Sequence, residues 1–479
     1  MKLFRKAVLT AAAVLSVLSA NAEGYQINSQ SSRQWGMAHT GTALKLGAES
    51  MTFNPAGLVF MNSKYDVSLG TILIKSKVKF EQGAYKHETD NPLSTPIFGH
   101  FGYKVNDKFA VGVNITNPAG NSLVWGDDWA GSTLIQNVSL KAFNVQPTVS
   151  YRINDFVSIG AGLMIDFGSF EQEKALIQKN QLEALIPLAN SLKPMMPALG
   201  ALPAAIESFH GMYPAEIELS GSSKVAYGFN VGALVNITPK LTFGVNYRSK
   251  VKLSVEGGEA EVDYANTAAD EVVKTIANFT LPAQVAGMLD DATKKTVAST
   301  IANMQLIRNL DEAEFDASMP IPSILSFGLT YQPNDAWTLT GEAQITGWSA
   351  YKTLDIAFKR DGQQIYLQTS EKNYDNTVCV RLGAQYVAND FVTYRAGVYM
   401  DTPPVQMDNY NPETPSANCY GITAGATLNP TKYMAIDLSV GYLQGEKTTG
   451  SCLNSDGSLF KADYTKSAIM PGIGVRFNF

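Results

Sequence analysis

The sequence contains few cysteines, histidines and charged residues. Its 479 residues include only 3 Cys and 4 His, and none of these lies in a recognisable nucleophile motif or has the spacing of a zinc site. We therefore expect no enzyme activity, no metal and no cofactor. The net charge of −6 is mild for this length, so we also expect no nucleic-acid partner.

Long apolar runs are missing as well. Beyond the N-terminus, no stretch approaches the roughly 20 apolar residues that a membrane-spanning helix needs. Charged residues make up 17% of the chain, against about 25% in soluble domains. Gly (39), Phe (22) and Tyr (21) are abundant. The composition favours an all-β transmembrane barrel over an exported soluble protein.

The first 22 residues are typical of a secretory signal peptide. Three basic residues precede a short apolar stretch over residues 7–18. Ala20-Asn21-Ala22 forms an A-x-A cleavage site. This pattern predicts a mature chain that begins at Glu23.

Most of the chain after residue 62 alternates apolar residues with small or polar ones. In the last run, Ile473, Val475, Phe477 and Phe479 share one face. A terminal Phe is typical of outer-membrane barrels, so Phe479 predicts recognition by the barrel-assembly machinery. We count fourteen antiparallel strands, near residues 64–80, 96–105, 108–119, 133–152, 155–171, 222–237, 241–256, 321–332, 336–359, 375–388, 391–401, 418–428, 432–445 and 463–479.

The connections alternate in length. Tight turns built from Asn, Asp and Pro alternate with longer loops, as in bacterial barrels, where the short turns are periplasmic. Two of the external loops are exceptionally long, at residues 172–220 and 257–319. We expect residues 62–479 to form the barrel in the outer membrane.

Residues 23–61 precede the first strand and show neither strand nor helix periodicity. They are rich in small residues yet carry apolar anchors such as Trp35 and Phe53. We interpret them as a hatch inside the lumen. The turn Asn54-Pro55-Ala56 joins this segment to the first strand. It is either the pivot of the hatch or an ordinary turn that directs the chain into the strand.

The two long loops are apolar, whereas external porin loops are mostly polar. Their apolar side chains either pack on one another or form a surface that captures a hydrophobic ligand. We favour capture, and the candidate residues are Leu182, Leu185, Ile186, Met195, Met196, Phe209, Phe279 and Met288.

Several short motifs in a characteristic order resemble the FadL family of outer-membrane transporters of long-chain fatty acids and hydrocarbons. They include Asn54-Pro55-Ala56, Tyr247-Arg248-Ser249, Gly347-Trp348-Ser349 and Asp401-Thr402-Pro403-Pro404. The resemblance implies a monomeric fourteen-stranded barrel with an N-terminal hatch. It also implies hydrophobic ligand capture between the third and fourth external loops, and lateral release beside a kinked third strand. In this chain the third strand ends at Asn117-Pro118. Proline removes a ladder donor there, which fits either a lateral opening or an ordinary strand end.

Uptake of an amphiphile with a carboxylate head would need a cation in the path. Strand alternation predicts that Arg248, Lys250 and Lys252 point inward, although they could instead lie at a solvated strand end or pair with loop acids. Arg381 and Arg395 also fall on lumen faces, where we expect them to pair with Asp or Glu.

Two questions stay open at this point. Cys419 and Cys452 lie on neighbouring external connections of an oxidising compartment, so they form either a disulfide or, with Cys379, three thiols. The rival functions are a general porin for small polar solutes and, less favoured, a lipid-modifying enzyme. The rival porin would lack a forty-residue plug and apolar loops.

Overall fold

The computed structural model describes residues 24–177, 182–183, 185–194, 197–208, 213–454 and 457–479. The predicted signal peptide lies outside the described residues. Among the described residues, no helix is long and apolar enough to cross a membrane.

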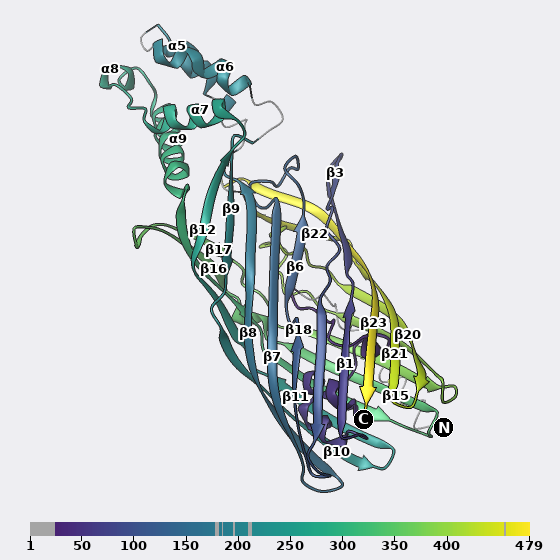
Figure 1. Cartoon of the computed structure of the whole chain (residues 1–479). Helices are drawn as coiled ribbons and strands as arrows, with labels where there is room; N and C mark the ends of the chain where they lie inside the picture. The colour runs from purple at the N-terminus through teal and green to yellow at the C-terminus, as the bar shows by residue number, and fades with distance from the viewer. Residues whose placement is uncertain (1–23, 178–181, 184, 195–196, 209–212, 455–456) are drawn as a thin grey trace.

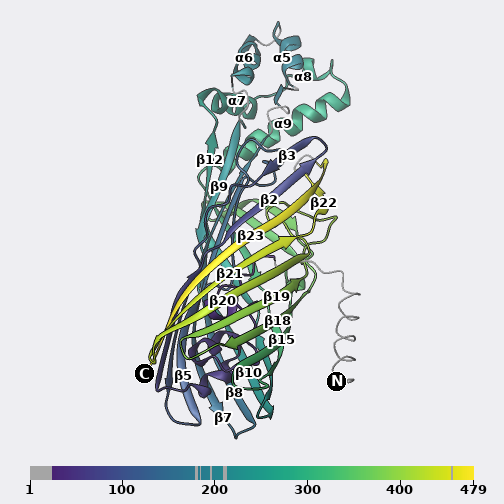
Figure 2. The same cartoon turned by 90° about the vertical axis from the view of Figure 1, so that its right-hand side faces the viewer.

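Fourteen antiparallel strands close into a barrel, as the alternation predicted (Figures 1 and 2). Each strand pairs with the next, and the last pairs with the first. In ring order they are β1 (Tyr65–Ile72), β4 (Ile97–Lys104), β5 (Phe109–Thr116), β7 (Asn137–Arg152), β8 (Val157–Ala175), β10 (Ala226–Thr238), β11 (Leu241–Arg248), β14 (Ile324–Tyr331), β15 (Trp337–Thr346), β18 (Thr377–Val387), β19 (Val392–Asp401), β20 (Cys419–Thr431), β21 (Met434–Gly445) and β23 (Leu459–Asn478).

The first and last strands of the ring meet where the barrel closes. Tyr65 and Phe479 exchange two backbone hydrogen bonds of 3.0 Å each. Large apolar side chains such as Leu163, Phe229 and Ile473 point outward, each about half exposed. This apolar outer face is what a membrane-embedded barrel requires.

The short turns are built by asparagine side chains. Asn106, Asn154, Asn334 and Asn389 each accept a backbone N–H two or three residues further on. Because these local bonds replace ladder bonds, each strand ends there and reverses. All four turns lie at the end of the barrel opposite the long loops.

The wall continues outward as a second tier of strands. These are β2 (Lys75–Gln82), β3 (Tyr85–Glu88), β6 (Gly120–Val124), β9 (Ala215–Ser222), β12 (Val251–Tyr264), β13 (Ala313–Ile321), β16 (Thr353–Arg360), β17 (Gln363–Glu371) and β22 (Thr448–Leu453).

The single strand predicted over 336–359 was wrong. A 3₁₀ turn, η4 (Trp348–Ala350), ends β15, and β16 then pairs with β13 rather than β14. Gly347 opens the turn and Trp348 is buried beneath it, 1% exposed. This branch leaves the ring at fourteen strands.

Apart from η4, the helices in the described part of the chain lie in the two long loops and the N-terminal segment. The first loop contains α5 (Ile186–Leu192), η3 (Pro197–Ala201) and α6 (Leu202–Glu207), and the second contains α7 (Thr267–Ala277), α8 (Ala283–Ala286) and α9 (Asp291–Leu310). Both sets sit beyond the external tier of strands (Figures 1 and 2).

The N-terminal segment lies inside the ring of strands, in the half of the barrel near the short turns (Figure 1). Four short helical turns shape it: α2 (Ser32–Trp35), η1 (Gly47–Glu49), α3 (Ser50–Phe53) and η2 (Pro55–Phe60). Ser31 caps α2 by accepting the N–H of Gln34 at 3.1 Å. Below, "hatch core" means residues 29–61 and "hatch arm" means residues 24–28.

Candidate functional site

A carboxylate on the wall holds the hatch core. Glu342 of β15 accepts the backbone N–H groups of Gly41 and Thr42, both at 2.9 Å. Arg381 of β18 approaches the same carboxyl at 3.4 Å, and both side chains are at most 4% exposed. The inward position predicted for Arg381, and its acidic partner, are therefore confirmed. Because two amides and a cation converge on it, Glu342 fixes this part of the hatch.

A second carboxylate belongs to the hatch itself. Glu49 pairs with Arg33 at 2.7 Å and accepts the hydroxyl of Ser68 on β1 at 2.7 Å. On the wall nearby, Arg395 lies 3.9 Å from Asp437, which confirms its predicted acidic partner. The hatch core is thus attached to two separate parts of the ring.

Asn54 is a third attachment. Its amide donates to the carbonyls of Thr42 at 2.8 Å, Ala233 at 3.0 Å and Val245 at 3.2 Å, and its Oδ1 accepts the N–H of Ala56. Glycines on the facing strands make room for the turn, because a Cβ at Gly232 would lie 2.1 Å from Asn54 Oδ1. This geometry favours an anchor over a pivot at Asn54-Pro55-Ala56.

The hatch arm is attached differently. It extends beside the end of the third strand, where Gln26 and Ala119 form a β-bridge. Ile27 donates its N–H to Pro118, and Gly120 donates to Tyr25. The Tyr25 hydroxyl donates to the carbonyl of Pro320. The arm therefore occupies an edge that a strand could otherwise occupy.

The wall is incomplete at this edge. Pro118 has no N–H, and β7 is the only strand that pairs with β6 within the described part of the chain. Asn117 spans the break with its side chain, accepting the N–H of Ile97 at 2.9 Å and donating to Ala142 at 2.8 Å. Strand pairing is therefore interrupted at Asn117 and Pro118, and the lateral opening expected there stays a prediction.

A large cavity of about 880 Å³ lies at this break. It reaches from the hatch arm to residues on both faces of β7, since buried Leu140 and exposed Lys141 both line it. The cavity therefore connects the lumen with the outer side of the wall beside β6.

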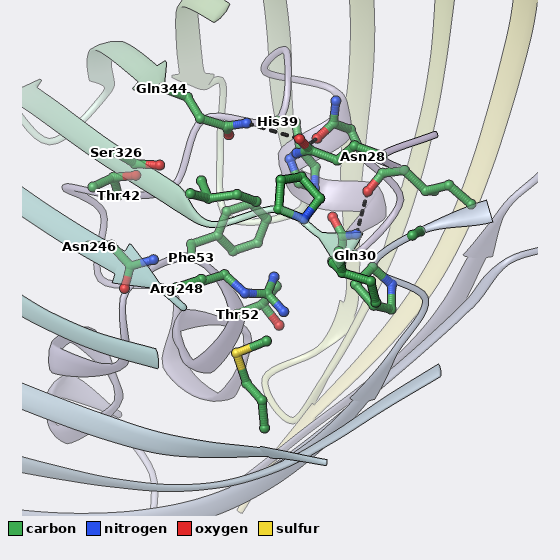
Figure 3. A pocket seen from close by; sticks show the side chains of 18 of the residues that line it. Asn28, Gln30, His39, Thr42, Thr52, Phe53, Asn246, Arg248, Ser326 and Gln344 are labelled. Carbon is green, nitrogen blue, oxygen red and sulfur yellow. Dashed lines mark hydrogen bonds between the residues drawn. The ribbon is translucent and has the colours of Figure 1, made fainter. Parts of the chain in front are cut away.

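A smaller cavity of about 50 Å³ lies between the arm and the core of the hatch. Arg248 of β11 points into it beside Asn246, Thr52 and Phe53 (Figure 3). Arg248 is 8% exposed, and among the described residues it has no ion-pair partner within 4.0 Å. A buried guanidinium facing a cavity can donate hydrogen bonds to a carboxylate or phosphate oxygen.

The prediction that Arg248, Lys250 and Lys252 all point inward was wrong for the two lysines. Lys250 and Lys252 are exposed, and only Arg248 faces the lumen. β11 ends at Arg248 and β12 restarts at Val251, with Ser249 also buried. This break shifts the alternation by one residue and turns Lys252 outward.

Two small apolar cavities lie above the hatch arm. One of about 30 Å³ lies between β7, β8, β12 and β13, and one of about 20 Å³ borders Tyr25. They are adjacent because they share four lining residues: Leu140, Phe170, Met319 and Leu354. Tyr25 lines both the lower of these cavities and the Arg248 cavity, so its ring lies between the two.

The two long loops meet at a further apolar cavity of about 50 Å³. Apart from two threonines, its lining is apolar: Leu185, Ala189, Leu199, Leu202, Ile276, Phe279, Leu281, Val297 and Ile301. Of the predicted capture residues, Leu185 and Phe279 therefore line it. Leu182 is fully buried, Ile186 is partly buried, and Met288 is 74% exposed on the surface. Met195, Met196 and Phe209 lie outside the described residues.

The structure has no Cys419–Cys452 disulfide. All three cysteines are buried thiols. Cys419 belongs to the apolar cluster around Trp35, together with Cys379, whereas Cys452 of β22 belongs to the large external cluster. Burial raises the pKa of Cys452 to about 11. Of the two alternatives that the sequence left open, the structure has the thiols, because Cys419 and Cys452 lie in different clusters.

Sequence reasoning missed Glu342 and Tyr25. Glu342 lies in a strand whose alternation predicts an inward side chain. An acidic residue at an inward position could therefore have been identified from the sequence. Tyr25 carried no such signal, because its partners lie about 300 residues away. No group of three His, Cys, Asp or Glu side chains in the described ranges is placed to hold a metal ion.

The comparisons with known proteins agree on one family of outer-membrane transport proteins. A family model described as outer membrane protein transport protein (OMPP1/FadL/TodX) matches residues 13–479. The long-chain fatty acid transport protein of Escherichia coli strain K12 is 23% identical over 452 residues, covering 93% of each chain. The 47 kDa outer membrane protein of Pasteurella multocida is 25% identical and covers 99% of each chain.

Solved structures share the fold. A Pseudomonas aeruginosa FadL homologue superimposes with a TM-score of 0.74 at 20% identity, covering 95% of this chain and 100% of that one. The P. putida toluene transporter TodX gives a TM-score of 0.65 at 16% identity, covering 95% and 99%.

Proposed function

The chain belongs to the OMPP1/FadL/TodX family of outer-membrane transport proteins, and from this membership we propose that it takes up long-chain fatty acids or similar hydrophobic compounds by passive diffusion. The family consists of transport channels rather than enzymes. As a monomer, the protein would admit ligand from outside, hold it above the hatch and release it sideways into the membrane.

One observation carries this proposal. The hatch core closes the barrel axis, while the largest cavity leads sideways to the break beside β6. A polar solute crossing vertically would meet the hatch. An apolar molecule leaving through the break would enter lipid, where its transfer is favoured by about 25 cal/mol for each Å² of apolar surface.

Capture would start between the long loops. Leu185 and Phe279 both line the cavity between the helices of the two long loops. The ligand would then pass to the two cavities above the hatch arm, which are separate from the loop cavity and have mostly apolar linings. Each step replaces contact with water by contact with apolar side chains, so the path needs no energy source.

Gating would depend on the hatch arm. Tyr25 separates the upper cavities from the Arg248 cavity, and its ring contacts Trp348 at 4.6 Å between centroids. A ligand can displace the arm only by binding the displaced state better. Arg248 provides such a preference for a carboxylate head over a plain hydrocarbon.

The test is uptake of oleate by cells that lack other transporters of this family. The double variant Leu185→Asp, Phe279→Asp places charge in the capture cavity, and we expect uptake to fall roughly tenfold or more, because burying one such side chain is worth about 1.5–3 kcal/mol. The matched control is Leu459→Asp, on an external hairpin elsewhere, where the native leucine is 65% exposed. Full uptake in the double variant would contradict capture at this cavity.

A parallel measurement separates this proposal from a general porin. Liposomes containing the purified protein should not swell in small sugars, because the hatch core closes the axis. Rapid swelling would favour the porin instead.

A further inference from the structure

The segment between β19 and β20, residues 402–418, crosses the external mouth of the lumen; we call it the strap. Its sequence is polar and contains four prolines, which is typical of an exposed loop. Yet Val405, Tyr410 and Ala417 are each at most 4% exposed. The strap is therefore folded into the mouth rather than projecting from it.

The strap, which connects β19 and β20, is hydrogen-bonded to residues on the opposite side of the ring. Asn121 of β6 donates to the carbonyl of Glu413 at 2.9 Å, and the Trp125 indole donates to the carbonyl of Pro412 at 3.0 Å. In ring order, β7, the partner of β6, stands opposite β19 and β20. The strap thus spans the lumen between these two sides of the ring.

A buried ion pair holds the strap in place. The Glu413 carboxylate accepts Lys372 Nζ, with side chains 12% and 2% exposed respectively. Gln172 of β8 donates to the same carboxylate at 3.4 Å. Burial beside Glu413 also raises the pKa of Tyr374, so its hydroxyl stays neutral.

A second lysine makes the cluster electropositive. Lys174 of β8 interacts electrostatically with both Glu413 and Lys372, and its Nζ donates to the neutral Gln368 at 2.7 Å. Lys372 is the lysine paired with Glu413, and among the described residues Lys174 has no carboxylate within 4.0 Å. The second lysine is therefore available to a further anion.

The cluster adjoins the ligand path. Glu413 and Thr414 line the small cavity that borders Tyr25, and the rest of that lining is mostly apolar. A hydrocarbon tail in the upper cavities would place its head group at this lysine pair.

We propose that an incoming long-chain carboxylate replaces Glu413 as the counter-ion of Lys372 and Lys174, and that this exchange releases the strap. The inference rests on the proposed uptake of amphiphiles and specifies the step that admits them. No covalent bond forms or breaks; one carboxylate substitutes for another.

The exchange follows from the cost of an unpaired buried charge. Pulling Glu413 away would leave Lys372 buried without an anion, which is strongly unfavourable. A carboxylate ligand removes that cost, whereas an uncharged ligand with the same tail does not. The strap therefore opens to fatty acids and stays closed to neutral hydrocarbons, because only the former bind the released state better.

The first test measures strap release in the otherwise unaltered chain. Thr414, 7% exposed, is replaced by cysteine, and its maleimide labelling is followed with oleate or with methyl oleate. We expect oleate to accelerate labelling roughly tenfold and methyl oleate to leave it unchanged. Equal effects of the two probes, or no effect of bound oleate, would overturn the exchange.

The second test removes the competitor. Glu413→Gln should bind oleate roughly tenfold more tightly than wild type, because the ligand no longer displaces a charged side chain. Glu371→Gln, an exposed carboxyl next to Lys372, should bind like wild type. Unchanged or weaker binding in a folded Glu413→Gln variant would contradict the proposal. Failure of wild type to bind oleate at all would instead reject the proposed function.

Discussion

The two parts of the hatch are attached to the barrel by different kinds of interaction. The core, residues 29–61, is fixed by buried carboxylates and by Asn54. The arm, residues 24–28, is attached to the barrel wall mainly by neutral hydrogen bonds. These are the backbone bonds around its β-bridge, the Tyr25 hydroxyl bond, and the bonds that Gln26 accepts from Gln344 and Thr346. Charged hydrogen bonds in a buried site are costly to break, whereas a backbone bond is readily exchanged for another. The difference shows how one plug can have two roles: the core closes the lumen, and the more weakly attached arm can move when ligand binds.

Glu342→Gln should loosen the core most. The change removes the charge of the carboxyl that Arg381 approaches and weakens the acceptor of two amides. We expect this to cost about 1–3 kcal/mol in the closed state of the hatch. We expect faster hydrogen exchange at Gly41 and Thr42, measured by mass spectrometry, and swelling of liposomes in small sugars. Glu256→Gln, which alters an exposed carboxyl, is the control. Unchanged exchange at both amides would show that other contacts hold the core.

Asn54→Ala tests the anchor against the pivot. The variant loses three donated hydrogen bonds, and we expect the core to be destabilised by about 1–3 kcal/mol. An anchor predicts a folded barrel that leaks small sugars. A pivot predicts a sealed barrel with impaired oleate uptake and unchanged external binding, and that outcome would reverse our assignment.

Asn117→Ala acts on the edge where the arm lies. It removes the side-chain link between Ile97 and Ala142, worth about 1–2 kcal/mol. We expect faster exchange of the Ile97 amide and no sugar leak, since the core is untouched. A leak in this variant would show that the arm and the core are coupled.

Tyr25→Phe should have the smallest effect. It removes only the hydroxyl bond to Pro320, about 0.5–1.5 kcal/mol. Exchange of the Gly120 amide, which donates to Tyr25, should rise modestly while Gly41 and Thr42 stay protected. Equal loss of protection in arm and core would break the distinction drawn between them.

Much of the fold followed from local pattern. Alternation and asparagine turns predicted the strands, their number and the ends at which short turns lie, because both signals depend on neighbours in the sequence. The errors arose where a strand breaks. Lys252 was predicted to point inward because the break after Arg248 was not recognised. Residues 336–359 were predicted as one strand because the turn at Trp348 was not recognised.

The candidate site was predictable only in part. Asn117 and Pro118 were identified because proline marks the end of a ladder. The inward position of Arg248 was predicted from strand alternation. Glu342, Tyr25 and the Lys372–Glu413 pair were missed, since each depends on partners that are distant in sequence.

The sequence by itself determined an outer-membrane barrel with an N-terminal insert and two apolar loops, because period, turn chemistry and composition are local properties of the chain. Only the tertiary structure decided which side chains share a cavity, which carboxylate holds which part of the hatch, and that no disulfide joins Cys419 to Cys452. The physical reason is that closing the ring brings together groups hundreds of residues apart, such as Tyr25 and Pro320. Their contacts depend on the registers of all the strands between them.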